Sequence, residues 1–251
     1  MPHPLRNARP DDPFLRFNLD EAQVVDFRID GDHVGLARPG RRAGELWVSA
    51  LGNDPERILA LIEALSADRE IDGIHVHDEI YSQLPDRLRI PDPGHWSIWL
   101  ITAPDVAHDL SYWARGAREI DAHDARIDPL LSHSDSAYLM AGDPSIRRWV
   151  GVLDGPRLVA VGAESDIANG IPHLVSICTD PEQRRHGHGK AVTAQLVSGA
   201  FERGESLVYL EMYAGNKAAA SLYRSLGFRE VGRYRSGWIP GRAPRPAREP
   251  A

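Results

Sequence analysis

The chain has 251 residues, of which 42% are hydrophobic, enough for one large domain or two smaller ones with buried cores. Its formal net charge of -7 gives no electrostatic reason to expect nucleic acid as a partner. The single cysteine excludes an internal disulfide, the first residues lack the apolar run of a signal peptide, and no stretch approaches the roughly 20 apolar residues that span a bilayer. We therefore expect a cytoplasmic protein with no membrane partner.

The first half of the chain has the pattern of a small α/β domain. Residues 1–20 are rich in Pro, Arg and Asp, which predicts a flexible arm. Asp54-Pro55 has the composition of an N-cap and a first helical residue, and apolar residues at helical spacing follow it. Strands are predicted at residues 24–29, 33–37, 46–51, 74–77 and 96–101. We place an α/β domain at 21–104.

The second half predicts another mixed α/β fold. Residues 105–134 are polar with helical spacing of apolar residues, and we interpret them as a helical connector, with the leading helices of the second domain as the alternative. A domain at 135–238 is predicted to contain a hairpin, a strand, a helix, a strand, a second helix and a last strand. The hairpin covers residues 149–153 and 158–163, the strand after it covers 173–179, and the first helix ends at about residue 203. The next strand covers 207–212, the second helix 216–226, and the last strand 228–234. The Pro/Arg-rich tail at 239–251 is predicted to be disordered.

One stretch of the second half points to a ligand. The strand at 173–179 is stopped by Asp180-Pro181, and Gly187 and Gly189 then open a helix. The first N–H groups of a helix have no intrahelical partner and carry the positive end of its dipole, so they can bind an anion. Glycines let a phosphate approach closely, and Arg184, Arg185 and Lys190 add positive charge. The stretch predicts a phosphate or pyrophosphate site.

Two familiar phosphate motifs do not fit this stretch. A Walker loop requires Gly at the position of Arg184 and Ser or Thr at that of Ala191, and a dinucleotide fingerprint requires Gly at that of Val192. The run Arg184-Arg185-His186-Gly187-His188-Gly189 instead resembles motif A of the GNAT acetyltransferase superfamily. Downstream, the run from Asn216 to Phe228 resembles the second GNAT signature, Asn-x-x-Ala-x-x-x-Tyr-x-x-x-Gly-Phe.

The resemblance implies a GNAT fold over the second half, a mixed central sheet flanked by helices. It also implies that the chain moves an acetyl group from acetyl-coenzyme A, as co-substrate, to a primary amine by direct transfer. The first half has the same order of strand, helix and strand, but no Arg-x-x-Gly-x-Gly follows Leu51. We interpret it as a possible degenerate GNAT-like copy that does not bind the cofactor.

Site residues follow from the resemblance. The main chain of the strand end is implied to hold the pantetheine arm and thioester, and the loop the diphosphate. Asn216 lies near the cofactor in the family pattern, although a plain N-cap is the alternative. The implied cofactor-binding residues are Ile177, Cys178, Thr179, Arg184, Arg185, His186, Gly187, His188, Gly189, Lys190, Asn216 and Tyr223.

The catalytic assignment needs an acid and a base. Tyr223 stands where the family places the acid that protonates the departing thiolate, and the alternative is a core aromatic on the buried stripe of its helix. Glu211 and His173 match positions where relatives carry a base. An ion-paired strand carboxylate and a strand-end histidine are equally good interpretations of these two, and a water chain could replace both.

Other features leave alternatives open. His75 with His77, and His186 with His188, lack a third ligand of definite spacing, so we expect no metal. Cys178 lies in an apolar strand, which favours packing over a role as nucleophile. The competing function is a non-catalytic acyl-coenzyme A sensor or interaction module of the same fold. The acceptor, the acyl length and a homodimer stay open.

Overall fold

The computed structural model describes residues 3–40, 42–90, 93–106, 109–165 and 170–240. They form two compact units, which we treat separately: Met1–Ser97 with Tyr213–Gly215 and Gly232–Ala251, and Ile98–Met212 with Asn216–Val231. The division after Ser97 differs from the expected boundary at residue 104. The reason is that β5 (Gly94–Thr102) and β11 (Arg229–Trp238) each begin in one unit and end in the other. Most of the predicted tail, residues 241–251, lies outside the described residues.

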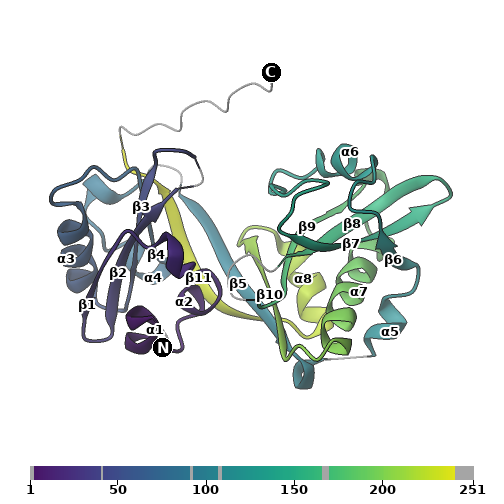
Figure 1. Ribbon diagram of the computed structural model, residues 1–251, viewed down its shortest axis with the longest axis horizontal. Helices are drawn as coiled ribbons and strands as arrows, with labels where there is room; N and C mark the ends of the chain where they lie inside the picture. The colour runs from purple at the N-terminus through teal and green to yellow at the C-terminus, as the bar shows by residue number, and fades with distance from the viewer. Residues whose placement is uncertain (1–2, 41, 91–92, 107–108, 166–169, 241–251) are drawn as a thin grey trace. The chain divides into compact units, whose positions relative to one another are not determined.

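The first unit has the strand order β1-β2-β3-β4-β11 (Figure 1). Its other strands are β1 (Asp26–Asp30), β2 (His33–Pro39), β3 (Leu46–Leu51) and β4 (Gly73–His77). Its helical elements are α1 (Pro4–Ala8), α2 (Pro13–Phe17), η1 (Glu21–Gln23), α3 (Pro55–Ser66), α4 (Asp78–Tyr81) and η2 (Asp86–Leu88). The helix α3 begins where the sequence predicts, because the Asp54 side chain accepts hydrogen bonds from the main-chain N–H groups of Glu56 and Arg57.

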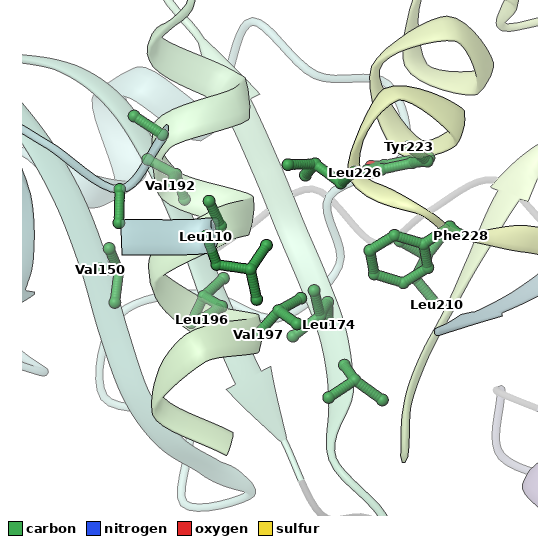
Figure 2. Close-up of a cluster of buried hydrophobic side chains, with 14 of the residues drawn as sticks. Leu110, Val150, Leu174, Val192, Leu196, Val197, Leu210, Tyr223, Leu226 and Phe228 are labelled. Carbon is green, nitrogen blue, oxygen red and sulfur yellow. The ribbon is translucent and has the colours of Figure 1, made fainter. Parts of the chain in front are cut away.

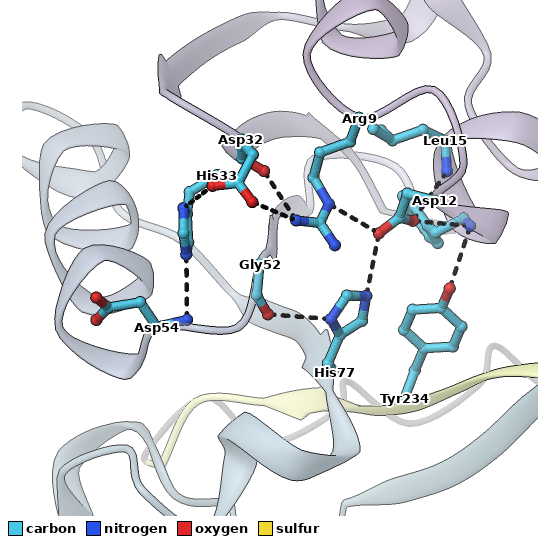
Figure 3. A network of polar contacts seen from close by, with 10 residues as sticks. Arg9, Asp12, Leu15, Asp32, His33, Gly52, Asp54, His77 and Tyr234 are labelled. Atoms are coloured by element: carbon cyan, nitrogen blue, oxygen red, sulfur yellow. Dashed lines mark hydrogen bonds and ion pairs between the residues drawn. The ribbon is translucent and has the colours of Figure 1, made fainter.

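The expectation of a flexible arm over residues 1–20 is wrong for the described part. Two short helices form there, and the Asp12 carboxylate caps the second by accepting from the N–H groups of Phe14 and Leu15. The same carboxylate contacts Arg9 and His77 (Figure 3). The segment buries Leu5, Phe14, Leu15, Phe17 and Leu19. The composition of residues 1–20 led to a wrong prediction because these apolar residues have no clear periodicity. They become buried only by packing onto strands that are distant in the sequence.

The second unit has the strand order β5-β10-β9-β8-β7-β6. Its other strands are β6 (Ala117–Ile120), β7 (Ile146–Asp154), β8 (Arg157–Ser165), β9 (His173–Thr179) and β10 (Leu207–Tyr213). Its helical elements are η3 (Ala103–Asp105), α5 (Leu110–Trp113), α6 (Ile127–Leu131), η4 (Pro181–Gln183), α7 (His188–Glu202) and α8 (Lys217–Leu226). The strands β9 and β10 are parallel, whereas β6 to β9 pair antiparallel. This is the mixed sheet flanked by helices that the sequence predicts.

Residues 105–134 are not a separate connector, which corrects the expected domain order. They contain β6, which extends the sheet of the second unit by pairing with β7 in the register Ile120 to Trp149. They also contain α6, whose side chains Ile127, Leu130 and Leu131 are buried. A four-residue strand of polar composition is hard to recognise in sequence because its pairing partner lies about 30 residues downstream.

The sheet of the second unit separates two cores (Figure 1). We call the larger one the α7-side core; it includes Trp99, Ile101, Leu110, Val150, Leu174, Val192, Leu196, Val208, Leu210, Tyr223, Leu226 and Phe228 (Figure 2). The α6-side core includes Ile127, Leu130, Leu131, Leu139, Trp149, Val161, Ala163, Val175 and Cys178. Because strand side chains alternate, neighbouring residues of β9 and β10 contribute to opposite faces.

A buried ion-pair network fixes α7 against the sheet. Glu164 of β8 is fully buried and pairs with Arg148 of β7, at 2.9 Å between Oε2 and Nε, and with Arg203 after α7. Arg148 also donates to the carbonyl of Leu196, and a Cβ on Gly199 would overlap its guanidinium. Gly199 is therefore needed where the second half of α7 passes over Arg148.

The two units repeat one topology. In the first, β1, β2 and β3 pair antiparallel in chain order, α3 follows, and β4 is parallel to β3. In the second, β7, β8 and β9 pair in the same way, α7 follows, and β10 is parallel to β9. The repeat supports a degenerate copy in the first half, which stays a prediction.

Candidate active site

The loop between β9 and α7 has the geometry that the glycine motif predicts. Its backbone turns through two left-handed residues, Arg185 at φ 68° and Gly187 at φ 84°. Gly187 is the N-cap of α7 and has no side chain to cap the helix. A Cβ on Gly189 would lie 3.1 Å from the Thr179 hydroxyl, so this glycine allows the helix to start close to the end of β9.

The loop presents a row of free hydrogen-bond donors. Among the residues that the structure describes, none accepts a hydrogen bond from the main-chain N–H groups of Arg184 to Lys190. A Cβ on Gly187 would meet nothing within 4 Å, so the space outside the loop is open. Unpaired N–H groups at the positive end of a long helix are a ready site for an anion such as a diphosphate.

The charged residues of the loop divide into two groups. Arg184, Arg185 and His186 are exposed and leave their charge available beside the loop. Lys190 lies differently, because its ammonium nitrogen is 3.3 Å from the ring centroid of Trp113 on α5. Desolvation lowers the Lys190 pKa, and the contact with the ring stabilises the cation. The Lys190 ammonium therefore contacts Trp113 of α5.

The strand β9 carries an irregularity that no sequence pattern predicted. Ser176 has φ 51°, a left-handed value that is rare for a residue with a Cβ. The register against β8 jumps from Val161↔Cys178 to Ala163↔Val175, so β9 has one extra residue around Ser176 and Ile177. Such a bulge turns main-chain groups out of the ladder and is common beside active sites.

The two parallel strands diverge beyond the bulge. They are paired at Tyr209↔His173 and Leu210↔Leu174, and these fully described strands have no further pairs although both continue. Ile177, Cys178 and Thr179 therefore lie on the part of β9 that β10 does not cover. Their main-chain groups on this side are available to a ligand that enters between the strands.

Tyr223 lies on the α7-side face of the sheet. It is 7% exposed and packs beside Leu226 and Phe228 (Figure 2). No hydrogen bond joins its hydroxyl to any described residue. Burial raises the Tyr223 pKa above its ordinary value of 10, so the phenol keeps its proton at neutral pH.

Glu211 and His173 lie on the opposite face from Tyr223. Val208 and Leu210 of β10 pack in the α7-side core, so Tyr209 and Glu211 point to the other face. His173 is 6% exposed and stacks on Tyr209 at 4.3 Å between ring centroids. Burial raises the Tyr209 pKa, and the nearby charge of Glu211 adds to the shift. The structure thus brings both predicted bases together around Tyr209, a residue that sequence analysis did not select.

The remaining predicted residues have clear structural roles. The Asn216 side chain accepts from the N–H of Ala219 and caps α8, and Gly227 ends α8 at φ 105°. Cys178 is buried and donates its Sγ–H to the Leu130 carbonyl at 3.3 Å. Burial raises the Cys178 pKa, which keeps the thiol protonated and unreactive. The interpretation of Cys178 as a packing residue fits this geometry.

The matching position of the first unit is closed to an anion. The Asp54 carboxylate caps α3 itself, and the N–H of Asp54 donates to the His33 ring. A carboxylate in that place repels a phosphate and occupies the donors that would bind it.

The fold and the site define a class of protein, an α/β domain with a glycine-containing loop at a helix start beside two parallel strands whose pairing stops at Leu210↔Leu174. Residues 108–228 match the family model described as Acetyltransferase (GNAT) family. This part of the chain is a GNAT acetyltransferase domain, as the two motifs predict.

Individual relatives match shorter segments. A ribosomal protein bS18 alanine N-acetyltransferase of Escherichia coli strain K12 is 42% identical over 58 residues, 23% of this chain and 39% of that protein. The N-alpha-acetyltransferase RimI of Mycobacterium tuberculosis is 36% identical over 87 residues, 34% of this chain and 53% of that protein. The matches span about half or less of these curated relatives.

A solved structure matches over a greater length. The GCN5-related N-acetyltransferase from Kribbella flavida is 18% identical, with a TM-score of 0.58, over 93% of this chain and 95% of that chain. At this identity the likeness shows a shared fold. Within the described ranges, no helix has the length and apolar character needed to cross a bilayer, and no cluster of His, Cys, Asp or Glu has the geometry of a metal site.

Proposed function

We propose that the protein is an N-acetyltransferase that moves an acetyl group from acetyl-coenzyme A to a primary amine by direct transfer. The observation that carries the proposal is the divergence of β9 and β10 next to the bulge at Ser176. Tyr223 lies on one face of the sheet, and Glu211 with His173 lies on the other. Donor and acceptor can therefore approach from opposite faces and meet between the strands.

The loop residues fit the diphosphate of the donor. The N–H groups from Arg184 to Lys190 bind its oxygens, and Arg184 and Arg185 supply further positive charge. The open space beside Gly187 admits the group. The main chain of Ile177 to Thr179 aligns the pantetheine arm along the uncovered side of β9 and directs the thioester to the bulge.

The residues on the acceptor face prepare the nucleophile. Glu211 is partly exposed and accepts a proton from the acceptor ammonium, either directly or through water, whereas His173 is buried against Tyr209 and orients this face. The neutral amine then forms a bond to the acetyl carbon, and its nitrogen releases a second proton to solvent as the amide forms, while solvent returns a proton to Tyr223 after the transfer described below. A main-chain N–H near the bulge that is directed at the carbonyl oxygen stabilises the developing negative charge.

Tyr223 completes the transfer. As the carbon–sulfur bond breaks, its electron pair stays on sulfur, and the Tyr223 hydroxyl donates its proton there. Because burial raises the Tyr223 pKa, the phenol keeps its proton at neutral pH, and the proton is present when the thiolate departs. The first unit is proposed to be the degenerate copy, because Asp54 fills its helix start.

The test measures thiol release and binding in parallel. The intact protein is incubated with acetyl-coenzyme A and a panel of primary amines, free thiol is followed with a thiol reagent, and coenzyme A binding is measured by calorimetry. We expect binding and amine-dependent thiol release above the rate without amine. Binding with no release for any amine would identify the sensor alternative, and the absence of binding would exclude both functions.

A further inference from the structure

The left-handed residue Ser176 makes a hydrogen bond that leaves its own strand. Its hydroxyl donates to the carbonyl oxygen of Leu139 at 2.8 Å, a residue 37 positions earlier in the chain. The unusual φ of 51° is what directs the side chain out of the β9 ladder at the bulge. One residue thus joins the point where β9 and β10 begin to diverge to a segment between α6 and β7.

That segment, Ala137 to Ala141, is irregular, and nearby residues hold part of its main chain: the N–H of Ala137 donates to the Ser134 carbonyl, and the Met140 carbonyl accepts from the N–H of Asp143. Leu139 is buried in the α6-side core, and the N–H of Ala141 donates to the Asp128 carboxylate at 2.9 Å. No regular secondary structure covers residues 137–140. The bond from Ser176 is one of the contacts that fix this segment, which we call the 137–141 wall, and it ties the segment to β9.

Two large apolar side chains of the wall remain exposed. Tyr138 is 43% exposed and Met140 is 37% exposed, on either side of the buried Leu139. Tyr138 is close enough to Tyr209 to contribute to the raised pKa of that residue, together with Glu211. Because Leu139 packs in the α6-side core and accepts the bond from Ser176, the wall lies on the face of the sheet that carries Glu211 and His173, beside the bulge of β9.

We propose that Ser176 is a positioning residue that fixes the 137–141 wall beside Glu211, and that Tyr138 and Met140 select an acceptor with an apolar group next to its ammonium. This inference rests on the proposed transferase function. An ammonium near a carboxylate and an aromatic face is attracted by both, and its apolar substituent is desolvated against Tyr138 and Met140.

Two substitutions of Ser176 distinguish the loss of its hydrogen bond to Leu139 from the backbone strain at its left-handed φ. Ser176→Ala removes the hydroxyl and keeps an unfavourable φ, whereas Ser176→Gly removes the hydroxyl at a φ that glycine adopts freely. Ser132→Ala is the control, because Ser132 also donates to a main-chain carbonyl, that of Pro129 at 2.7 Å, but only locally. Hydrogen exchange of residues 137–141, calorimetry with coenzyme A, and kinetics with 2-phenylethylamine and ethylamine are measured for each variant.

In the wild type we expect a kcat/KM for 2-phenylethylamine at least about tenfold above that for ethylamine. Both Ser176 variants should show faster exchange at 137–141 and a KM for 2-phenylethylamine raised about fivefold, the scale of one lost hydrogen bond. The kcat/KM for 2-phenylethylamine should fall more than that for ethylamine, because a disturbed bulge alone would lower the rates with both amines alike and would also raise the coenzyme A Kd. Ser132→Ala should match the wild type in every measurement.

Three results would overturn the inference. Exchange that stays slow in both Ser176 variants would show that the bond does not fix the wall. Faster exchange with an unchanged acceptor KM would show that the wall does not contact the acceptor. Turnover of other amines without preference for 2-phenylethylamine would exclude the apolar acceptor class. If no amine gives thiol release with the wild type, the proposed function itself fails, and that result is recognised before any variant is made.

Discussion

The Asp12 carboxylate and the His77 imidazole form a contact of 3.1 Å between Oδ2 and Nε2 in the first unit, and the Asp12 side chain is almost fully buried (Figure 3). Arg9 lies 3.2 Å from the same oxygen, and the other carboxylate oxygen caps α2. Burial alone raises the Asp12 pKa, but the hydrogen bond and charge of His77, with those of Arg9, outweigh it and lower the pKa below 3.8.

This contact predicts acid-sensitive docking of residues 4–19. A carboxylate with a lowered folded pKa contributes stability that is fully present above its unfolded pKa and is lost as the pH falls through the folded pKa. Hydrogen exchange at residues 4–19 should therefore increase as the pH drops below 3.8. Asp12→Asn should raise exchange already at pH 6 and destabilise the protein by about 2 kcal/mol. Asp11→Asn, at an exposed neighbour, should not; equal effects of the two substitutions would contradict the prediction.

The anion-binding loop can be tested with two matched glycines. Gly187 at φ 84° and Gly155 at φ 56° are both left-handed, and a Cβ on either would meet nothing within 4 Å. Replacing either by alanine should cost about 1 kcal/mol of stability through backbone strain. Only Gly187→Ala should weaken coenzyme A binding in calorimetry, by about tenfold or more, because only this glycine lies among the free N–H groups. Equal coenzyme A affinities in the two variants would show that the loop is not part of the binding site.

The acid assignment predicts a specific loss at Tyr223. Since its hydroxyl makes no hydrogen bond to the described residues, Tyr223→Phe should leave the melting temperature nearly unchanged. The kcat for thiol release should fall by about 100-fold or more, with coenzyme A affinity preserved. Tyr112→Phe, at an exposed tyrosine of α5, serves as the control and should keep full activity. A normal kcat in the Tyr223→Phe variant would show that Tyr223 is a core aromatic residue without a role as acid.

The choice of base can be decided by two substitutions on the acceptor face. Glu211→Gln keeps the shape and removes the proton acceptor, so kcat/KM should fall by about 100-fold. His173→Phe keeps a ring that can stack on Tyr209 and removes the imidazole, and its loss should stay below about tenfold. Rates are compared at saturating acetyl-coenzyme A across the neutral pH range. The reverse order of losses would assign the base to His173.

The sequence alone could predict those parts of the site that depend on neighbouring residues. The loop between β9 and α7 follows from two glycines after a strand stopped by Asp180-Pro181, and α8 follows from a capping Asn216 and a terminating Gly227. The strand β9 was predicted with its observed limits, His173–Thr179. In each case the backbone preference of one residue, or a bond to a residue three or fewer positions away, decides the structure.

Long-range contacts decided the rest. Residues 4–19 are ordered because Asp12 meets His77 and because apolar side chains without periodicity are buried on distant strands. The bulge at Ser176 depends on a register shift against β8 and on a bond to Leu139. The sequence named Tyr223, Glu211 and His173 as separate motif positions, but only the tertiary structure put Tyr223 on one face of the sheet and the other two on the opposite face, because strand pairing is set by the packing of the whole sheet.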